Sequence, residues 1–252
     1  MGLFKSSNPL LNEKSIDKAG TVDNLSGDQL ITTSNNEVTT ISGAINKTLI
    51  LFALLMVTTF VSYAAPSQIF LYTGMFGGIA ALIVAMWKPH LAPIVAPIYA
   101  LVEGLFVGTI SAMYAAAFDG IVLQAVTLTF GTLLAMLVLY RSGLIKVTAK
   151  FRAGVMMATG AIMFVYIISI IGHFVGFQVP FLHETGPLGI GISVVIIAVA
   201  AMNLLLDFDM FERAEKNRSP KYMEWLVGMG LLVTLVWLYI EFLRLLSKLQ
   251  SD

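Results

Sequence analysis

Long apolar segments alternate with short polar ones through most of this chain. Seven such segments lie at 46–65, 69–87, 93–116, 119–140, 153–176, 186–207 and 223–246. An α-helix needs about 20 apolar residues to cross the hydrocarbon core of a bilayer. The pattern therefore predicts an all-α integral membrane protein, built as a bundle of seven transmembrane helices.

The first part of the chain has a different pattern. Residues 1–42 are rich in Ser, Thr and Asn and contain no sustained apolar period. Such a segment buries too little apolar surface to offset the entropy that ordering costs. We expect a disordered arm over 1–42, followed by a membrane domain over 43–252. The first apolar run is too long and begins too late for a signal peptide.

Composition supports the membrane class and excludes several others. Hydrophobic residues make up 58% of the chain and charged residues 12%, against about 25% charged residues in a soluble domain. The net charge is zero, so nothing suggests a nucleic-acid partner. The absence of cysteine excludes disulfides and thiolate sites. Since the GxSxG, P-loop and HExxH motifs are absent as well, we expect neither an enzyme nor a bound cofactor.

The basic residues predict an orientation. Lys and Arg occur in the arm, between 141 and 152 and between 213 and 221, whereas the connections near 66, 118 and 180 carry none. Because cytoplasmic loops are enriched in Lys and Arg, this alternation predicts a cytoplasmic N-terminus in a cell (inner) membrane. The side of the C-terminus stays open, since Gly228 and Gly230 could interrupt the last segment.

Two acidic residues lie in or at the end of apolar segments, where a charged side chain is energetically costly. Asp207 ends the sixth apolar segment and Glu241 lies inside the seventh. A charge within the bilayer costs at least about 2.5–3.5 kcal/mol, so such acids are candidates for ion or proton handling. The alternative for Asp207 and Asp209 is solvation at a helix end. For Glu241 it is a same-face ion pair with Arg244, three residues on, with both side chains reaching toward the interface.

Two further charged residues lie in or beside apolar segments. Glu103 is near the middle of the third segment, with no basic residue within one helical turn. It either lines a pathway or is a neutral acid bonded to a neighbouring helix. Gly104 and Gly108 next to it form a small-xxx-small pair, which is typical of close helix packing. Lys88 follows Trp87, an arrangement typical of an anchor at the membrane interface.

Three strings near the end of the chain carry a family resemblance. They are Leu206-Asp207-Phe208-Asp209, Pro220-Lys221-Tyr222-Met223-Glu224-Trp225 and Leu238-Tyr239-Ile240-Glu241-Phe242-Leu243. Together with the order of segments over about residues 45–250, they resemble the Bax-inhibitor-like (transmembrane Bax-inhibitor-motif) family, especially its bacterial branch. Members typically carry one Asp at the end of helix six and a second in helix seven. Asp207 and Glu241 stand at these positions, and Lys88 is near a basic position that some relatives have in helix two.

The resemblance implies a fold and a site. The fold is a seven-helix bundle with helix seven central, and the site is a proton-sharing pair of Asp207 and Glu241 that gates a calcium leak. Two adjacent carboxylates titrate as a coupled pair, and when both are ionised they offer calcium a transient oxygen site. A straight helix would place Glu241 about 27 Å from Met223. The pair therefore requires an extra turn within 220–230.

The first functional hypothesis is thus a pH-sensitive cation leak, with calcium as the permeant ion and the lipid bilayer and cations as partners. The alternative is an interaction protein that modulates a membrane-bound protease, as some bacterial relatives do. A third hypothesis, an intramembrane aspartyl protease, fits less well because it requires two Asp residues and Glu241 takes the place of one.

Overall fold

The computed structural model describes residues 38–175 and 186–251, and its regular elements there are all helical. In chain order the elements are α2 (Ile41–Ala64), α3 (Gln68–Trp87), the short 3-10 helix η1 (Pro89–Leu91), α4 (Ala92–Ala117), α5 (Ile121–Arg141), α6 (Ala149–Val175), α8 (Pro187–Lys216) and α9 (Met223–Gln250). Seven helices in this part of the chain are long and apolar enough to cross a membrane, which confirms the predicted fold class.

Several helices are longer than their apolar segments. Helix α8 continues for nine residues beyond Asp207, the predicted end of the sixth segment, and stops at Lys216. Hydropathy marks where a helix leaves the apolar zone, whereas the hydrogen-bonded helix itself continues into water when its polar side chains can be solvated or paired. One such pair, Arg213 with Asp209, lies in this extension at a spacing of four residues.

The boundary of the membrane domain also differs from the prediction. Residues 1–37 of the expected arm lie outside the described residues. Residues 38–42, assigned to the same arm, are ordered against the connection between α8 and α9 and begin α2. Thr40 is the N-cap of α2, and its side chain accepts a hydrogen bond from the backbone N–H of Gly43. The helical domain therefore begins at Val38 rather than at residue 43.

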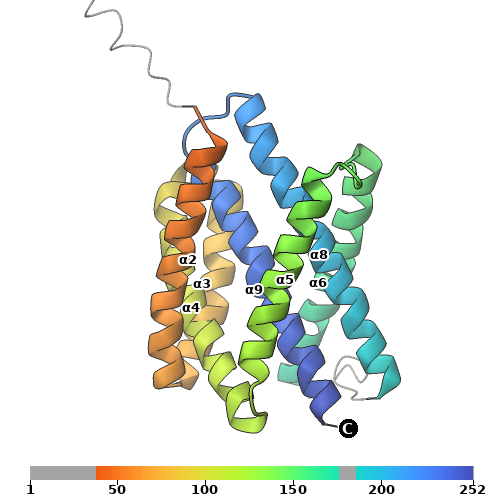
Figure 1. The fold of residues 1–252 in the computed structure, drawn as a ribbon. Coiled ribbons are helices and arrows are strands. Elements are labelled where there is room, and N and C mark those ends of the chain that lie inside the picture. Colours follow the sequence, from red (N-terminus) through yellow and green to blue (C-terminus); the bar gives the residue numbers. More distant parts are fainter. Residues whose placement is uncertain (1–37, 176–185, 252) are drawn as a thin grey trace, which may run out of the picture. The chain divides into compact units, whose positions relative to one another are not determined.

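Helix α9 is the centre of the bundle. Of its most apolar stretch 67% is buried, against 6–44% in the other six spanning helices. It packs against α2, α4, α5 and α8, and Figure 1 shows it passing between α2 and α5. The helix is continuous through Gly228 and Gly230. It therefore crosses the whole bundle, and its last residue lies at the opposite end from its first. Gly228 and Gly230 do not interrupt the last segment.

Helices α2 and α4 make the closest contact in the bundle. A side chain at Gly104 or Gly108 would collide with the backbone carbonyls of Leu55 and Thr59, respectively. Because both glycines lack a Cβ, the two backbones approach and the carbonyl of Gly104 accepts hydrogen bonds of 3.2 Å from Thr59 and Ser62. The small-xxx-small prediction is confirmed.

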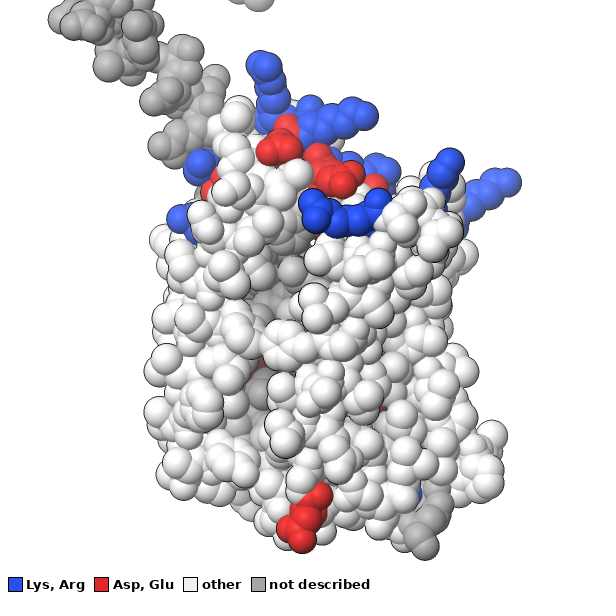
Figure 2. Space-filling view, viewed as in Figure 1, with Lys and Arg blue, Asp and Glu red and all other residues white. Residues whose placement is uncertain are grey.

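Charged side chains gather at one end of the bundle, where α2, α6 and α9 begin and α5 and α8 end (Figure 2). We call this the charged end. Its basic residues include Lys47, Arg141, Lys146, Lys150, Arg152, Arg213, Lys216, Arg218 and Lys221. The grouping follows the loop alternation seen in the sequence.

Candidate functional site

Asp207 lies within α8, on the side that faces α9. A Cβ built on Gly230 of α9 would be 3.9 Å from its Oδ1 atom, so the missing side chain of Gly230 leaves room for the carboxylate. The other oxygen, Oδ2, is buried and has no hydrogen-bond partner among the described residues. A buried polar atom without a partner is costly and rare, and it asks for an explanation in terms of function, water or an ion.

A cavity of about 390 Å³ opens beside this carboxylate, near the charged end. We call it the Asp207 cavity. Its lining comes from α6, α8, the connection between α8 and α9, and the first residue of α9: Arg152, Met156, Asn203, Leu206, Asp207, Asp209, Met210, Arg213, Ala214, Asn217, Ser219 and Met223. The Asn203 side chain is fixed in this wall, because its amide donates to Thr159 Oγ1 at 2.8 Å and to the carbonyl of Val199 at 2.9 Å. The cavity thus combines charged and amide groups with an unpartnered carboxylate oxygen.

Asp209 lines the same cavity, but unlike Asp207 it is held in ion pairs. Its Oδ2 is bonded to Arg152 of α6 and, at 2.7 Å, to Arg213 Nε one turn further along α8. Two guanidinium groups therefore surround one carboxylate and join α6 to α8 at the charged end. Asp209 thus holds α6 and α8 together at the cavity, whereas Asp207 has a carboxylate oxygen without a hydrogen-bond partner among the described residues.

Glu241 belongs to a closed network between α6 and α9. Its side chain is 1% exposed, and Oε1 accepts a hydrogen bond of 2.5 Å from Tyr166 Oη. Arg244 Nη1 donates to both carboxylate oxygens, at 2.9 and 3.1 Å, and to Tyr166 Oη at 2.8 Å. The Arg244 guanidinium also lies 5.2 Å from the Tyr166 ring centroid, within cation–π range. The alternative prediction, that Arg244 pairs with Glu241, matches this geometry.

The structure does not bring Asp207 and Glu241 together. Asp207 lies at the level of Gly230, and Glu241 is eleven residues further along α9, about 16 Å at a rise of about 1.5 Å per residue. The extra turn that the pair requires is absent, since α9 begins at Met223 and runs without a break. The proton-sharing pair and the shared calcium site implied by the resemblance are therefore not formed here.

The remaining predicted site residues lie away from both acids. Glu103 of α4 faces Gly78 of α3, on the other side of the bundle from α6 and α8. Lys88 is the exposed C-cap residue of α3, and its carbonyl accepts a hydrogen bond from the N–H of Leu91. In the described ranges no three His, Asp or Glu side chains come together as metal ligands.

Two buried charged groups were missed from the sequence. Glu224, in the first turn of α9, is 0% exposed; its Oε1 accepts hydrogen bonds from the N–H and hydroxyl of Thr40 at 3.1 and 3.2 Å. Lys248, near the other end of α9, is 5% exposed and donates to the Gly189 carbonyl and to Ser193 Oγ, each at 3.0 Å. Lys221, three residues before Glu224, also pairs with it. The partners that bury the two charges, on the start of α2 and on α8, lie far away in sequence and could not be read from a local pattern.

Glu224 is part of a contact that joins the start of α2 to the connection between α8 and α9. We call residues 38–41 the strap. The backbone N–H and the hydroxyl of Thr39 donate to the carbonyls of Ser219 and Pro220 at 2.8 and 2.7 Å. The N–H of Ile41 donates to Glu215 at 3.0 Å. Two carboxylates therefore satisfy N–H groups at the positive end of α2.

Comparison with known families gives one match, which covers nearly the whole chain. A family model described as Bax inhibitor 1 like matches residues 8–251. A search of curated proteins gives no match. The finer assignment to a bacterial branch stays a prediction.

Proposed function

Because the chain belongs to the Bax inhibitor 1 like family, we propose that this multi-pass membrane protein is a pH-sensitive cation leak. Calcium is the permeant ion that we expect first, and it passes through the protein rather than residing in it as a cofactor. The charged end lies in the cytoplasm of a cell whose inner membrane holds the bundle, as the Lys and Arg distribution favours. The protein carries out no catalytic reaction.

The observation that carries this proposal is that Asp207, whose buried Oδ2 has no hydrogen-bond partner among the described residues, lines a cavity at the charged end. A carboxylate oxygen is a ligand type that calcium prefers. In a membrane protein, an acid within a spanning helix that lies at a cavity marks an ion or proton pathway by default. Arg152 and Arg213 at the same cavity are both paired with Asp209, which offsets one of their two positive charges. Asp207, when ionised, would offset the other, and it is the acid of this lining that makes no ion pair among the described residues.

The two acids have separate roles in this mechanism. Asp207 attracts the cation when ionised and loses this attraction when protonated, so flux should fall as the pH falls. Glu241 lies deeper, and its charge is already matched by Arg244 and bonded by Tyr166. This network closes the bundle between α6 and α9 and must rearrange for an ion to pass. Asp207 thus attracts the cation and senses the pH, and the network of Glu241 closes the path between α6 and α9.

Calcium uptake into proteoliposomes over a pH series tests the proposal. The wild type should show uptake that rises with pH, and Asp207→Asn should lose this dependence because the amide keeps the shape of the side chain and cannot ionise. Asp119→Asn is the matched control: it makes the same change in the exposed turn between α4 and α5, at the opposite end of the bundle. It should keep the wild-type profile.

Two outcomes would contradict the proposal in different ways. If Asp207→Asn kept the wild-type pH profile, Asp207 would not be the sensor. If the wild type itself gave no uptake at any pH, the leak would be excluded and the alternative, a modulator that acts only with a partner such as a membrane protease, would be favoured.

A further inference from the structure

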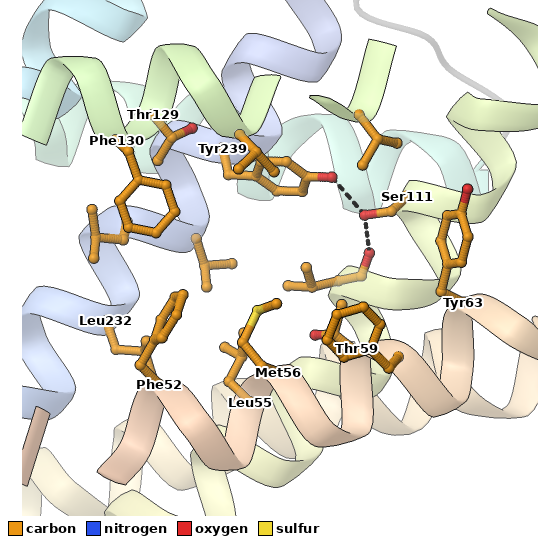
Figure 3. A pocket seen from close by; sticks show the side chains of 16 residues that line it. Phe52, Leu55, Met56, Thr59, Tyr63, Ser111, Thr129, Phe130, Leu232 and Tyr239 are labelled. Atoms are coloured by element: carbon orange, nitrogen blue, oxygen red, sulfur yellow. Dashed lines mark hydrogen bonds between the residues drawn. The ribbon is translucent and has the colours of Figure 1, made fainter. Parts of the chain in front are cut away.

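A second cavity lies between α9 and the helices α2, α4 and α5, and neither Asp207 nor Glu241 lines it. It is a groove of about 300 Å³ whose floor is α9 and whose walls are α2, α4 and α5. Figure 2 shows the surface hollowed between α2 and α5, and Figure 3 shows the side chains that line this groove. Leu232 and Leu235 of α9 belong to its lining. Figure 3 shows Phe52 of α2 and Phe130 of α5 together at one end.

The groove has an apolar surface although several hydroxyl groups line it. The Ser111 hydroxyl bonds to Tyr239 Oη at 2.7 Å and to the Val107 carbonyl at 2.6 Å, as the dashed lines in Figure 3 show. Thr59 donates to the Gly104 carbonyl at 3.2 Å, and Thr129 donates to that of Ala125 at 2.7 Å. These four hydroxyls are already hydrogen-bonded within the protein. A polar ligand would lose its hydration here and gain little in return.

The position of the groove in the helical bundle indicates that its opening faces lipid. Its walls are helices long and apolar enough to span a membrane, and its lining runs from the middle of α2 at Phe52 to the last turn of that helix at Tyr63. Its two outer walls, α2 and α5, meet through the edge-to-face contact of Phe52 and Phe130, with ring centroids 5.8 Å apart. Beyond this contact the walls separate and leave a lateral opening (Figure 2). Lipid chains, and not water, surround that opening in a bilayer.

We propose that this groove binds one hydrocarbon chain of a membrane lipid, inserted sideways between α2 and α5 onto α9. The apolar walls suit a saturated or unsaturated chain. Four of the five lining hydroxyls are already engaged, and the fifth, that of Tyr63, lies in the last turn of α2, so the groove offers a headgroup little. The volume is at the lower end of that of ligand pockets, which are mostly apolar; it admits a single chain and not a complete two-chain lipid. Without an occupant, the lateral groove would leave part of the central helix unpacked inside the bundle.

Photo-crosslinking in proteoliposomes tests this binding site. The probe is a phosphatidylcholine with a diazirine near the end of one acyl chain, and mass spectrometry of the digested protein locates the label. We expect label on Leu232 and Leu235 of α9, which are only 1% and 8% exposed. Lipid that touches just the outer surface cannot reach them. Label confined to outward residues such as Leu123 of α5 would overturn the proposal.

A pair of variants on α5 provides the control. Val126→Phe adds a ring to a residue that lines the groove, whereas Leu123→Phe adds the same ring to a side chain that is 73% exposed on the outward face. Val126→Phe should remove the label from α9, and Leu123→Phe should leave it unchanged. Equal labelling of α9 in the two variants would contradict the proposal. The mapping of label in the wild type decides the matter even if Val126→Phe fails to fold.

Discussion

Asp207 and Glu241 are acids on neighbouring spanning helices, yet their surroundings are opposite. Both Glu241 oxygens are bonded by Arg244, and one of them by Tyr166 as well. Asp207 has a buried oxygen without a partner and lies at a cavity near the charged end. The difference shows that an acid in a membrane helix is not by itself a site. The residues around the acid determine whether its carboxylate is bonded within the protein or is available to a ligand.

The largest expected effect comes from removing the cation next to Glu241. Arg244→Gln leaves a carboxylate that is 1% exposed without its counter-charge, and breaking a buried pair in this way costs about 3 kcal/mol. Thermal or denaturant unfolding of the detergent-solubilised protein measures the loss.

The double variant Arg244→Gln with Glu241→Gln is the control for this change. It removes both charges together and should recover most of the stability, because no unpaired charge remains. If Arg244→Gln alone were as stable as the wild type, the network would contribute nothing and the contrast with Asp207 would disappear.

A third buried acid, Glu224, is intermediate between Glu241 and Asp207 in how many of its carboxylate oxygens are bonded. One of its oxygens is bonded to Thr40 and Lys221, and the other has no partner among the described residues. Glu224→Ala should destabilise the protein by about 2 kcal/mol, because the N–H and the hydroxyl of Thr40 lose their buried acceptor. Hydrogen exchange at the Thr40 amide should accelerate.

Glu215→Ala is the matched variant for Glu224→Ala. Glu215 also accepts from the start of α2, through the N–H of Ile41, but this contact is exposed to solvent. Its loss should therefore cost less than the loss of Glu224. If the two variants were equally destabilised, burial of the cap would not matter, and the strap would be held by its backbone contacts alone.

The smallest effect is expected at Asp207 itself. Asp207→Asn removes a charge whose Oδ2 makes no hydrogen bond, so the stability should stay within about 1 kcal/mol of the wild type or rise. Glu241→Gln, the equivalent change in the bonded network, should lower it by more. Unfolding of the two variants under identical detergent conditions makes the comparison. A loss at Asp207→Asn as large as at Arg244→Gln would show that Asp207 is a packing acid too.

The sequence predicted the helices well because bilayer length and hydropathy act on each segment separately. The close contact at Gly104 and Gly108 was also predictable, since two small residues four positions apart lie on one face. Arg244 was found as a partner of Glu241 for the same local reason. These features need no knowledge of which helices are neighbours.

The rest of the site depends on contacts between distant residues. Tyr166 lies 75 positions from Glu241, and Thr40 lies 184 positions from Glu224. Nothing in the apolar surroundings of Tyr166 distinguishes it from other aromatic residues of the spanning helices. The end of α8 was misplaced because the apolar run ends at Asp207 while the helix itself continues to Lys216. Hydropathy reports the medium around a helix and not the partner of an individual side chain.

The central position of α9 has a consequence for how the bundle is made. Chains emerge from the ribosome with the N-terminal part first, so the most buried of the described helices is synthesised after the other six. Until it inserts, α2, α4, α5 and α8 lack the helix against which they pack, and the start of α2 lacks the carboxylate of Glu224. A nascent chain arrested before residue 223 therefore has six helices, of which α2, α3 and α4 can already pack on one another, but it lacks the helix at their centre. Insertion of α9 is thus the step that joins α2 and α4 to α5 and α8 around one core.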